Sequence, residues 1–163
     1  MIGEGPGRPT RSFKAANWTA RVTFSDNGFV ESWQLRDWFS DYLDACNGHD
    51  LEALRGLIDP SVRRAHLASG ADAWIADLAD LFGAFPDWQW KRIQLVVEDD
   101  RIAAHLRAGG THTGAFHGIA PTRRHVNVAE FGFFRVVKGR VVEYSGTADN
   151  AELAALLTGA RGA

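Results

Sequence analysis

The sequence predicts an α+β domain in which helices come first and a curved antiparallel sheet follows. Up to Pro86, apolar residues recur every three or four positions, which is the helical period. Beyond Pro86 the period changes to two, and runs rich in β-branched and aromatic residues alternate with turn signals. The links between these later runs are too short for parallel crossovers, so neighbouring strands should pair antiparallel. A length of 163 residues fits one such domain, expected over residues 31–163.

Four helices are predicted, at residues 31–46, 51–59, 71–85 and 150–157. Asp50 is a favoured N-cap for the second helix, and Pro60 ends it. Pro86 prevents the third helix from continuing. The first helix has the clearest apolar face, which consists of Leu35, Trp38, Phe39, Tyr42, Leu43 and Cys46.

Strands are predicted at residues 88–97, 101–110, 112–117, 124–137 and 140–148. The pairs Asp99-Asp100 and Lys138-Gly139 are turn-like joints between neighbouring strands. A sheet of this kind curls, the helices cover one opening, and the concave inside forms an apolar pocket.

Residues 1–30 form a predicted N-terminal extension that is rich in Gly, Pro and Arg at its start. The extension contains Trp18, Val22, Phe24 and Phe29, whose side chains gain nothing from exposure to water. It is therefore expected either to be partly flexible or to drape over the domain or a second copy of the chain.

Composition narrows the classes of partner. A net charge of −2 with interspersed signs gives no broad positive field for nucleic acid, so a small molecule is the favoured ligand. The lone cysteine, Cys46, cannot form an internal disulfide, which favours a reducing compartment. With no signal peptide and no run of membrane-span length in the sequence, the expectation is a cytoplasmic protein without membrane contact.

Side-chain alternation along the predicted strands points to acid/base chemistry. Glu130 falls on an otherwise apolar line of its strand, with Val126, Val128 and Phe134. In the last strand a polar row contains Glu143, Ser145, Thr147 and Asp149. If this row points into the concavity, burial would raise the carboxyl pKa values toward the range useful for proton transfer. Alternatively, Glu143 faces solvent and Asp149 caps the last helix.

The histidines and glycines of residues 109–125 give no specific metal or nucleotide motif. His112 and His117, with His105 or His125, lack the compact spacing of a metal site with a carboxylate. His112 is expected either to be satisfied by local backbone groups or to handle protons in the pocket. Ser145 lacks the sequence setting of a nucleophile and is at most a pocket hydroxyl.

Three stretches of the chain, AFPDWQW, EDDRIAAHLRAGGTHTGAFHGIAPTRRHV and FFRVVKGRVVEYSGTAD, resemble the SnoaL-like polyketide cyclases of the nuclear-transport-factor-two-like superfamily. The stretch ACNGHDLEAL is similar to the family's start, so the resemblance covers about residues 33–158. It implies a cone-shaped, strongly curved antiparallel sheet, a cystatin-like α+β barrel, usually assembled as a homodimer or higher oligomer.

The resemblance also implies an activity: intramolecular aldol condensation that closes a ring in a polyketide, without metal or cofactor. The acid/base role carries over to Asp149, and His112 carries over as a pocket histidine that orients substrate or binds an enolate oxygen. The chain departs from the family pattern at Arg123, where the family usually has Gly, and at Ser145, where the family usually has Trp. Because serine is smaller than tryptophan, Ser145 would enlarge or rewet the pocket. Residues expected to line the substrate pocket are Trp38, Tyr42, Trp74, Phe85, His105, Phe116, His125, Glu130, Phe133, Glu143 and Ser145.

Two further functions stay open at this point. Relatives of the same superfamily suggest water addition to an epoxide, or an oxygen-attack cyclisation that forms a cyclic ether. A different class is a non-catalytic protein that binds an aromatic metabolite, because flat side chains can line such a site.

Overall fold

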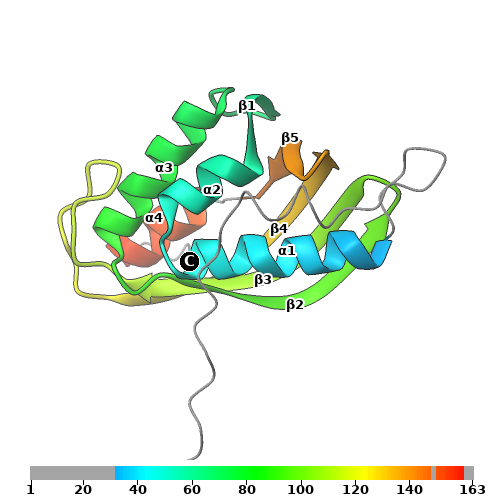
Figure 1. Cartoon of the computed structure of the whole chain (residues 1–163). Coiled ribbons are helices and arrows are strands. Elements are labelled where there is room, and N and C mark those ends of the chain that lie inside the picture. Colours follow the sequence, from blue (N-terminus) through cyan, green and yellow to red (C-terminus); the bar gives the residue numbers. More distant parts are fainter. Residues whose placement is uncertain (1–31, 148–149, 160–163) are drawn as a thin grey trace, which may run out of the picture.

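The computed structural model describes residues 32–147 and 150–159, and in these ranges four helices pack against one face of a five-stranded sheet (Figure 1). The predicted extension, residues 1–30, and Asp149 lie outside the described residues. The elements, in chain order, are α1 (Ser32–Asn47), α2 (Leu51–Leu57), β1 (Ile58–Arg64), α3 (Ala71–Ala84), β2 (Gln89–Glu98), β3 (Arg101–Thr111), β4 (His125–Val137), β5 (Arg140–Gly146) and α4 (Asn150–Thr158).

The sheet has the strand order β1-β5-β4-β3-β2. As predicted, β2, β3, β4 and β5 pair antiparallel with their sequence neighbours. The predicted all-antiparallel sheet is wrong in one respect, because β1 pairs parallel with β5 and makes the sheet mixed. The α+β class is confirmed, although the described strands do not close into a barrel.

The strand β1 replaces the end of the predicted second helix. Helix α2 ends at Leu57, and Ile58 already has extended backbone angles, φ −109° and ψ 134°. Pro60 cannot donate to a sheet ladder, but β1 is an edge strand, where a proline is tolerated. The β-branched Ile58 and Val62 bury their side chains completely. Packing against β5 therefore stabilises this segment as a strand rather than as a continuation of the helix.

The predicted strand over residues 112–117 is also wrong. The amides of Thr113 and Gly114 donate to Ala84 O at the end of α3, at 2.9 and 3.0 Å. Gly114 permits this contact, because a Cβ there would lie 2.4 Å from the carbonyl oxygen of Gly83. His117 and Gly118 then have left-handed φ values of 45° and 80° and reverse the chain. The segment is therefore a tight loop over the end of α3.

The core lies between the helices and the inner face of the sheet, meaning the face that the helices cover. On β4 the alternation follows the prediction, with Val126 and Phe134 buried, and on β3 Ile102 and Leu106 are buried. Helix α1 contributes the fully buried Trp38, whose Nε1–H donates to Gly139 O in the β4–β5 turn at 2.9 Å. In the described part of the chain, no helix has the length and apolar character needed to cross a membrane.

Replacing Trp38 by Phe should destabilise the fold, because the Gly139 carbonyl loses a buried hydrogen-bond donor. The expected loss is about 1–3 kcal/mol of unfolding free energy, measured by urea denaturation. Trp33→Phe is the matched control, because Trp33 is 58% exposed and its replacement should change stability by less than about 0.5 kcal/mol. Equal effects of the two substitutions would contradict the role given to the Trp38 contact.

Candidate active site

A cavity of about 210 Å³ opens between α3 and the inner face of β4 and β5. Aromatic and aliphatic side chains form most of its wall, and a few ionisable groups project among them. The lining residues are Arg64, Leu67, Trp74, Asp77, Leu78, Asp80, Leu81, Trp88, Trp90, Phe116, His117, Val128, Glu130, Tyr144, Thr147 and Leu153. We call this space the inner cavity.

Glu130 presents a carboxyl group to the inner cavity from the sheet, opposite Asp77 and Asp80 of α3. It lies on the inner face of β4, between Val128 and Phe134, because alternate residues of a strand share a face. The indole Nε1–H of Trp90 donates to Glu130 Oε2 at 2.7 Å. Burial raises the pKa of Glu130 above its usual value, and hydrogen bonds from Trp90 and Tyr144 oppose part of this rise. The cavity therefore contains an acid that gives up its proton at higher pH than an exposed glutamate.

Tyr144 supplies a hydroxyl group next to this carboxyl. It lies directly opposite Phe134 on β5, so its ring also faces inward, and it hydrogen bonds with Glu130. Burial raises the pKa of Tyr144 above its ordinary value, the charge of Glu130 raises it further, and Arg64 lowers it. The hydroxyl consequently stays protonated at neutral pH and can donate a hydrogen bond.

Two paired glycines make room for this arrangement. Gly132 on β4 lies opposite Gly146 on β5. A Cβ at Gly146 would lie 2.3 Å from the Tyr144 hydroxyl oxygen, and one at Gly132 would lie 2.7 Å from the ring of Phe134. Any larger residue at position 146 would displace the Tyr144 hydroxyl, so glycine is required by close approach rather than by backbone angles.

A bulge decides which side chains of β5 face the inner cavity. Arg135 pairs with Glu143 but Val136 pairs with Val141, so the β4–β5 register shifts between these pairs. As a result, Val141 and Tyr144 are both buried on the inner face. Glu143 and Ser145 point to the opposite, outer face of the sheet rather than into the concavity.

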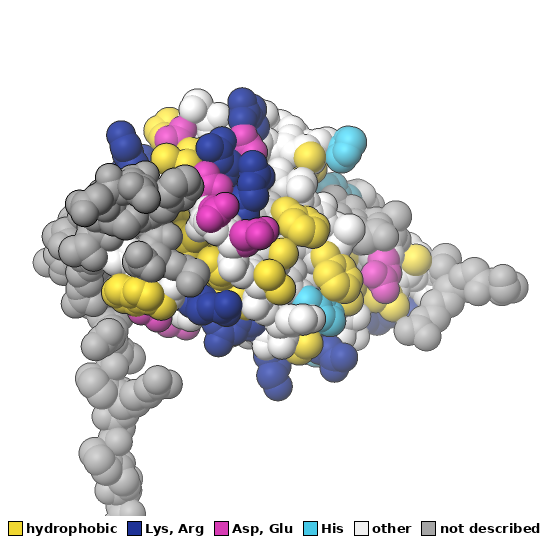
Figure 2. Space-filling model, turned by 90° about the vertical axis from the view of Figure 1, so that its right-hand side faces the viewer, with side chains coloured by type: hydrophobic (Ala, Val, Ile, Leu, Met, Phe, Trp, Pro, Cys, Tyr) yellow, Lys and Arg dark blue, Asp and Glu magenta, His cyan; other side chains and the backbone are white. Residues whose placement is uncertain are grey.

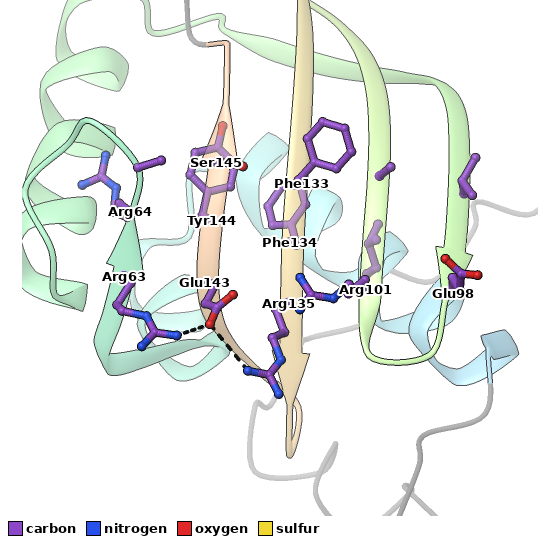
Figure 3. Close-up of a pocket in the computed structure, with 14 residues that line it drawn as sticks. Arg63, Arg64, Glu98, Arg101, Phe133, Phe134, Arg135, Glu143, Tyr144 and Ser145 are labelled. Atoms are coloured by element: carbon purple, nitrogen blue, oxygen red, sulfur yellow. Dashed lines mark hydrogen bonds and ion pairs between the residues drawn. The ribbon is translucent and has the colours of Figure 1, made fainter.

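The outer face has its own open hollow of about 590 Å³, which Glu143 and Ser145 line (Figure 3). Arg63 and Arg135 reach toward Glu143 from either side, Arg63 in a close ion pair and Arg135 at 3.5 Å (Figure 3). The hydrogen bond from Arg63 and the charges of both arginines hold the pKa of Glu143 below its usual range. Glu143 is thus an ionised partner of arginines, not a proton-transfer group.

Arg64 brings a cation to the wall of the inner cavity. Its side chain is 3% exposed and donates to Asp77 Oδ2 at 2.6 Å, which ties β1 to α3. Its guanidinium lies 5.2 Å from the ring centre of Trp74, within cation–π range. This contact fixes the indole of Trp74 as one wall of the cavity.

The other predicted pocket residues divide between the cavity, the core and the outer surface. Trp74, Phe116 and Glu130 line the inner cavity. The structure places Trp38, Tyr42 and Phe85 in the core, where Trp38 and Tyr42 stack with ring centres 5.5 Å apart. Phe133 lies in the outer hollow, His105 stacks on the exposed Phe131, and His125 is exposed beside Thr111.

His112 is completely buried but does not line the inner cavity. Its Nδ1 lies 3.1 Å from Thr122 Oγ1 and 3.2 Å from the Thr122 amide nitrogen, which donates to it. Its ring stacks on Phe85 with centres 5.0 Å apart. These contacts hold the loop after β3 against the end of α3. They satisfy Nδ1 only, because Nε2 is buried without a hydrogen-bond partner among the described residues, so the expectation of ring nitrogens satisfied by local backbone groups is met at one nitrogen and not at the other.

Several cavity residues were not among the predicted pocket residues, namely Arg64, Asp77, Trp88, Trp90, His117 and Tyr144. Alternation could not find Tyr144, because the β5 bulge reverses the faces expected for this strand, and only its pairing opposite Phe134 places it on the same face as Glu130. Arg64 could not be found, because no strand was predicted over residues 58–64. Within the described ranges, no three His, Cys, Asp or Glu side chains are grouped as metal ligands.

Comparison with known proteins identifies the family. A sequence model of the SnoaL-like polyketide cyclases matches residues 36–157, and the chain belongs to this family. AclR of Streptomyces galilaeus, a proposed hydroxylase, has the same fold, with a TM-score of 0.73, 22% identity and coverage of 82% of this chain and 86% of AclR. The comparison with curated proteins finds no match.

Two further solved structures extend this similarity. IdmH of Streptomyces antibioticus, a proposed polyketide cyclase, is 29% identical, with a TM-score of 0.66 and coverage of 76% of this chain and 97% of IdmH. A proposed SnoaL-like polyketide cyclase of Jannaschia sp. CCS1 is 24% identical, with a TM-score of 0.70 and coverage of 78% and 93%.

Replacing Tyr144 by Phe should raise the pKa of Glu130 further, because the hydroxyl hydrogen bond favours the ionised carboxylate. The change is measured by an NMR titration of the Glu130 side-chain carboxyl carbon. Gly146→Ala should shift the pKa in the same direction by displacing the hydroxyl. A Glu130 pKa that is unchanged in both variants would show that the two groups do not interact.

Proposed function

We propose that the protein is a cofactor-independent cyclase that closes a ring in a polyketide intermediate by an intramolecular aldol reaction in the inner cavity. One observation carries this proposal. The Glu130 carboxyl lies among aromatic walls, held by the Trp90 indole at 2.7 Å, with its pKa raised by burial. Membership of the SnoaL-like polyketide cyclase family supports a polyketide as the substrate class.

In the proposed mechanism, ionised Glu130 removes a proton from a carbon next to a substrate carbonyl. The electron pair of the broken C–H bond moves to the carbonyl oxygen, and the Tyr144 hydroxyl donates a hydrogen bond to the enolate. The enolate carbon attacks a second carbonyl of the same substrate and forms the new C–C bond. The alkoxide produced takes back the proton from Glu130, so the enzyme ends in its starting state.

The environment of Glu130 suits both proton transfers. A carboxyl whose pKa is raised is a stronger base than an exposed glutamate, and its conjugate acid is still able to protonate the alkoxide. Aromatic walls formed by Trp74, Trp88, Trp90 and Phe116 favour a flat substrate and would hold its chain folded. The protein supplies proximity, a tuned base and one hydroxyl donor.

The role of Asp149 remains a proposal drawn from the family resemblance, in which this residue is the acid/base group. His112 would then support the reaction from behind Phe85 rather than touch the substrate, because it does not line the inner cavity. Substitutions of Glu130 and Asp149 separate the two carboxyl assignments.

The proposal is tested with an aromatic β-keto ester in deuterium oxide, by following exchange of its activated methylene protons by NMR. Glu130→Gln should slow the protein-dependent exchange about 10²–10⁴-fold, because the variant lacks the base. Glu98→Gln on the outer face is the matched control and should exchange at the wild-type rate. Melting temperatures confirm that the variants fold.

The outcomes assign the base. If the Glu130→Gln variant exchanges the protons at the wild-type rate and the Asp149→Asn variant does not, the role of Glu130 is overturned and that of Asp149 is supported. Loss of stability with activity kept in Asp149→Asn would assign Asp149 to helix capping. Binding of the ester without exchange in the wild type would indicate a binding protein, and solvent oxygen-18 in a product would indicate hydrolysis.

The pH dependence of the same exchange gives an independent prediction. The rate should fall as the pH drops through the pKa of Glu130, because the protonated acid cannot remove a proton. Since burial raises that pKa, the midpoint of the fall should lie above 4.5. A midpoint at or below the usual value, or one unchanged in the Tyr144→Phe variant, would contradict the assignment.

Assembly as a homodimer and a cytoplasmic location are part of this proposal. The homodimer rests on the family resemblance, and the location rests on the lone cysteine, which favours a reducing compartment. Sedimentation velocity of the full chain tests the first, and cell fractionation tests the second.

A further inference from the structure

The outer face of the sheet exposes an apolar surface that no described helix covers. Val96 on β2, Ala103 on β3 and Phe133 on β4 lie side by side in register, and Phe131 follows in the next row. Val96 is 53% exposed, Phe131 47% and Phe133 61%. We call these four residues the outer patch.

The outer patch continues into the outer hollow, so apolar residues are bordered by charges. Figure 2 shows hydrophobic side chains beside a band of Lys, Arg, Asp and Glu side chains. In the hollow each arginine already has a carboxylate partner: Arg63 and Arg135 pair with Glu143, Arg101 with Asp100, and Arg64 with Asp77. A ligand for this surface therefore needs apolar side chains rather than a strong charge of one sign.

The N-terminal extension carries a segment with that chemistry. Residues 18–24 place Trp18, Ala20, Val22 and Phe24 at alternate positions, with Thr19, Arg21 and Thr23 between them. In an extended chain such alternation puts all the apolar side chains on one side and the polar ones on the other. The extension thus contains one row of apolar side chains whose removal from water would be favourable.

The end of the described chain lies within reach of the outer patch. Helix α1 runs opposite to β2 along the inner face, since Asn47 Nδ2 donates to Trp90 O at 3.0 Å and Arg92 Nη1 to Ser40 Oγ at 3.4 Å. Its first turn consequently lies toward the Val96 end of β2. Residues 25–31 can span about 23 Å when extended, which is enough for the roughly 20 Å between layers packed on the two faces of one sheet.

We propose that residues 18–24 of the same chain lie in extended form across the outer face and pack Trp18, Ala20, Val22 and Phe24 on the outer patch. Because the segment is tethered to the domain, its effective concentration at the domain's surface is in the millimolar range. This favours the segment over a second copy of the chain, which binds only in proportion to protein concentration. Arg21 then points to solvent between Thr19 and Thr23.

The proposal is tested by paramagnetic relaxation in the full chain. The buried Cys46 is replaced by Ala, Thr19 is replaced by Cys, and a nitroxide spin label is attached there. The label should broaden the amide signals of Val96, Ala103 and Phe133 more strongly than those of Trp74 and Leu78 on α3. Signals broadened equally on both faces, or only along the free edge of β2, would overturn the proposal.

A mixed sample separates the segment from a second copy. Spin-labelled chain without nitrogen-15 is mixed with nitrogen-15-labelled chain without the spin label. The proposal predicts no broadening of the outer patch in this mixture. Broadening would mean that the segment of one chain lies on another, which contradicts docking within the chain.

Substitutions in the segment give a matched control. Trp18→Ser with Val22→Ser and Phe24→Ser should abolish the preferential broadening of the outer patch and increase binding of the dye ANS. Thr23→Ser, on the interleaved row, should leave both measurements unchanged. Equal behaviour of the two variants would show that the apolar row does not hold the segment.

Discussion

The structure depends on the burial of one carboxyl group, that of Glu130, on the apolar inner face of the sheet. Burying an ionised carboxylate is costly unless hydrogen bonds compensate for the lost water. The Trp90 indole at 2.7 Å and the Tyr144 hydroxyl provide only part of this compensation, so the pKa remains raised. This incomplete compensation makes the group suitable for proton transfer, whereas a fully paired carboxylate would simply stay ionised.

The same sheet also contains a carboxyl group whose pKa is lowered, that of Glu143. Glu143 lies on the outer face next to Arg63 and Arg135, which lower its pKa, while Glu130 lies one strand away on the inner face. The β5 bulge causes this difference, because it turns Tyr144 inward and Glu143 outward. The Gly132–Gly146 pair then lets the Tyr144 hydroxyl approach Glu130. One register shift and two glycines therefore give Glu130 a raised pKa and Glu143 a lowered pKa in neighbouring strands.

Much of the fold was predictable from local pattern, and part of the site was too. Apolar periodicity located α1 and α3, and strand alternation placed Glu130 on the line of Val128 and Phe134. The strand β1 was not predictable, because its pairing with β5 is made by residues distant in sequence. Strict alternation also failed at the β5 bulge, since a bulge arises from how two strands meet. The contacts of Arg64 could not be predicted for the first of these reasons, because Arg64 lies on β1.

The central claim is that a flat substrate binds in the inner cavity with an oxygen near Glu130. The most direct measurement is a crystal structure of the protein with an aromatic β-keto amide that cannot cyclise. The account predicts the ligand between Trp74 and Trp90, with a ligand oxygen or nitrogen within about 3 Å of the Glu130 carboxyl or the Tyr144 hydroxyl. A ligand bound only in the outer hollow, beside Arg63 and Arg135, would contradict it.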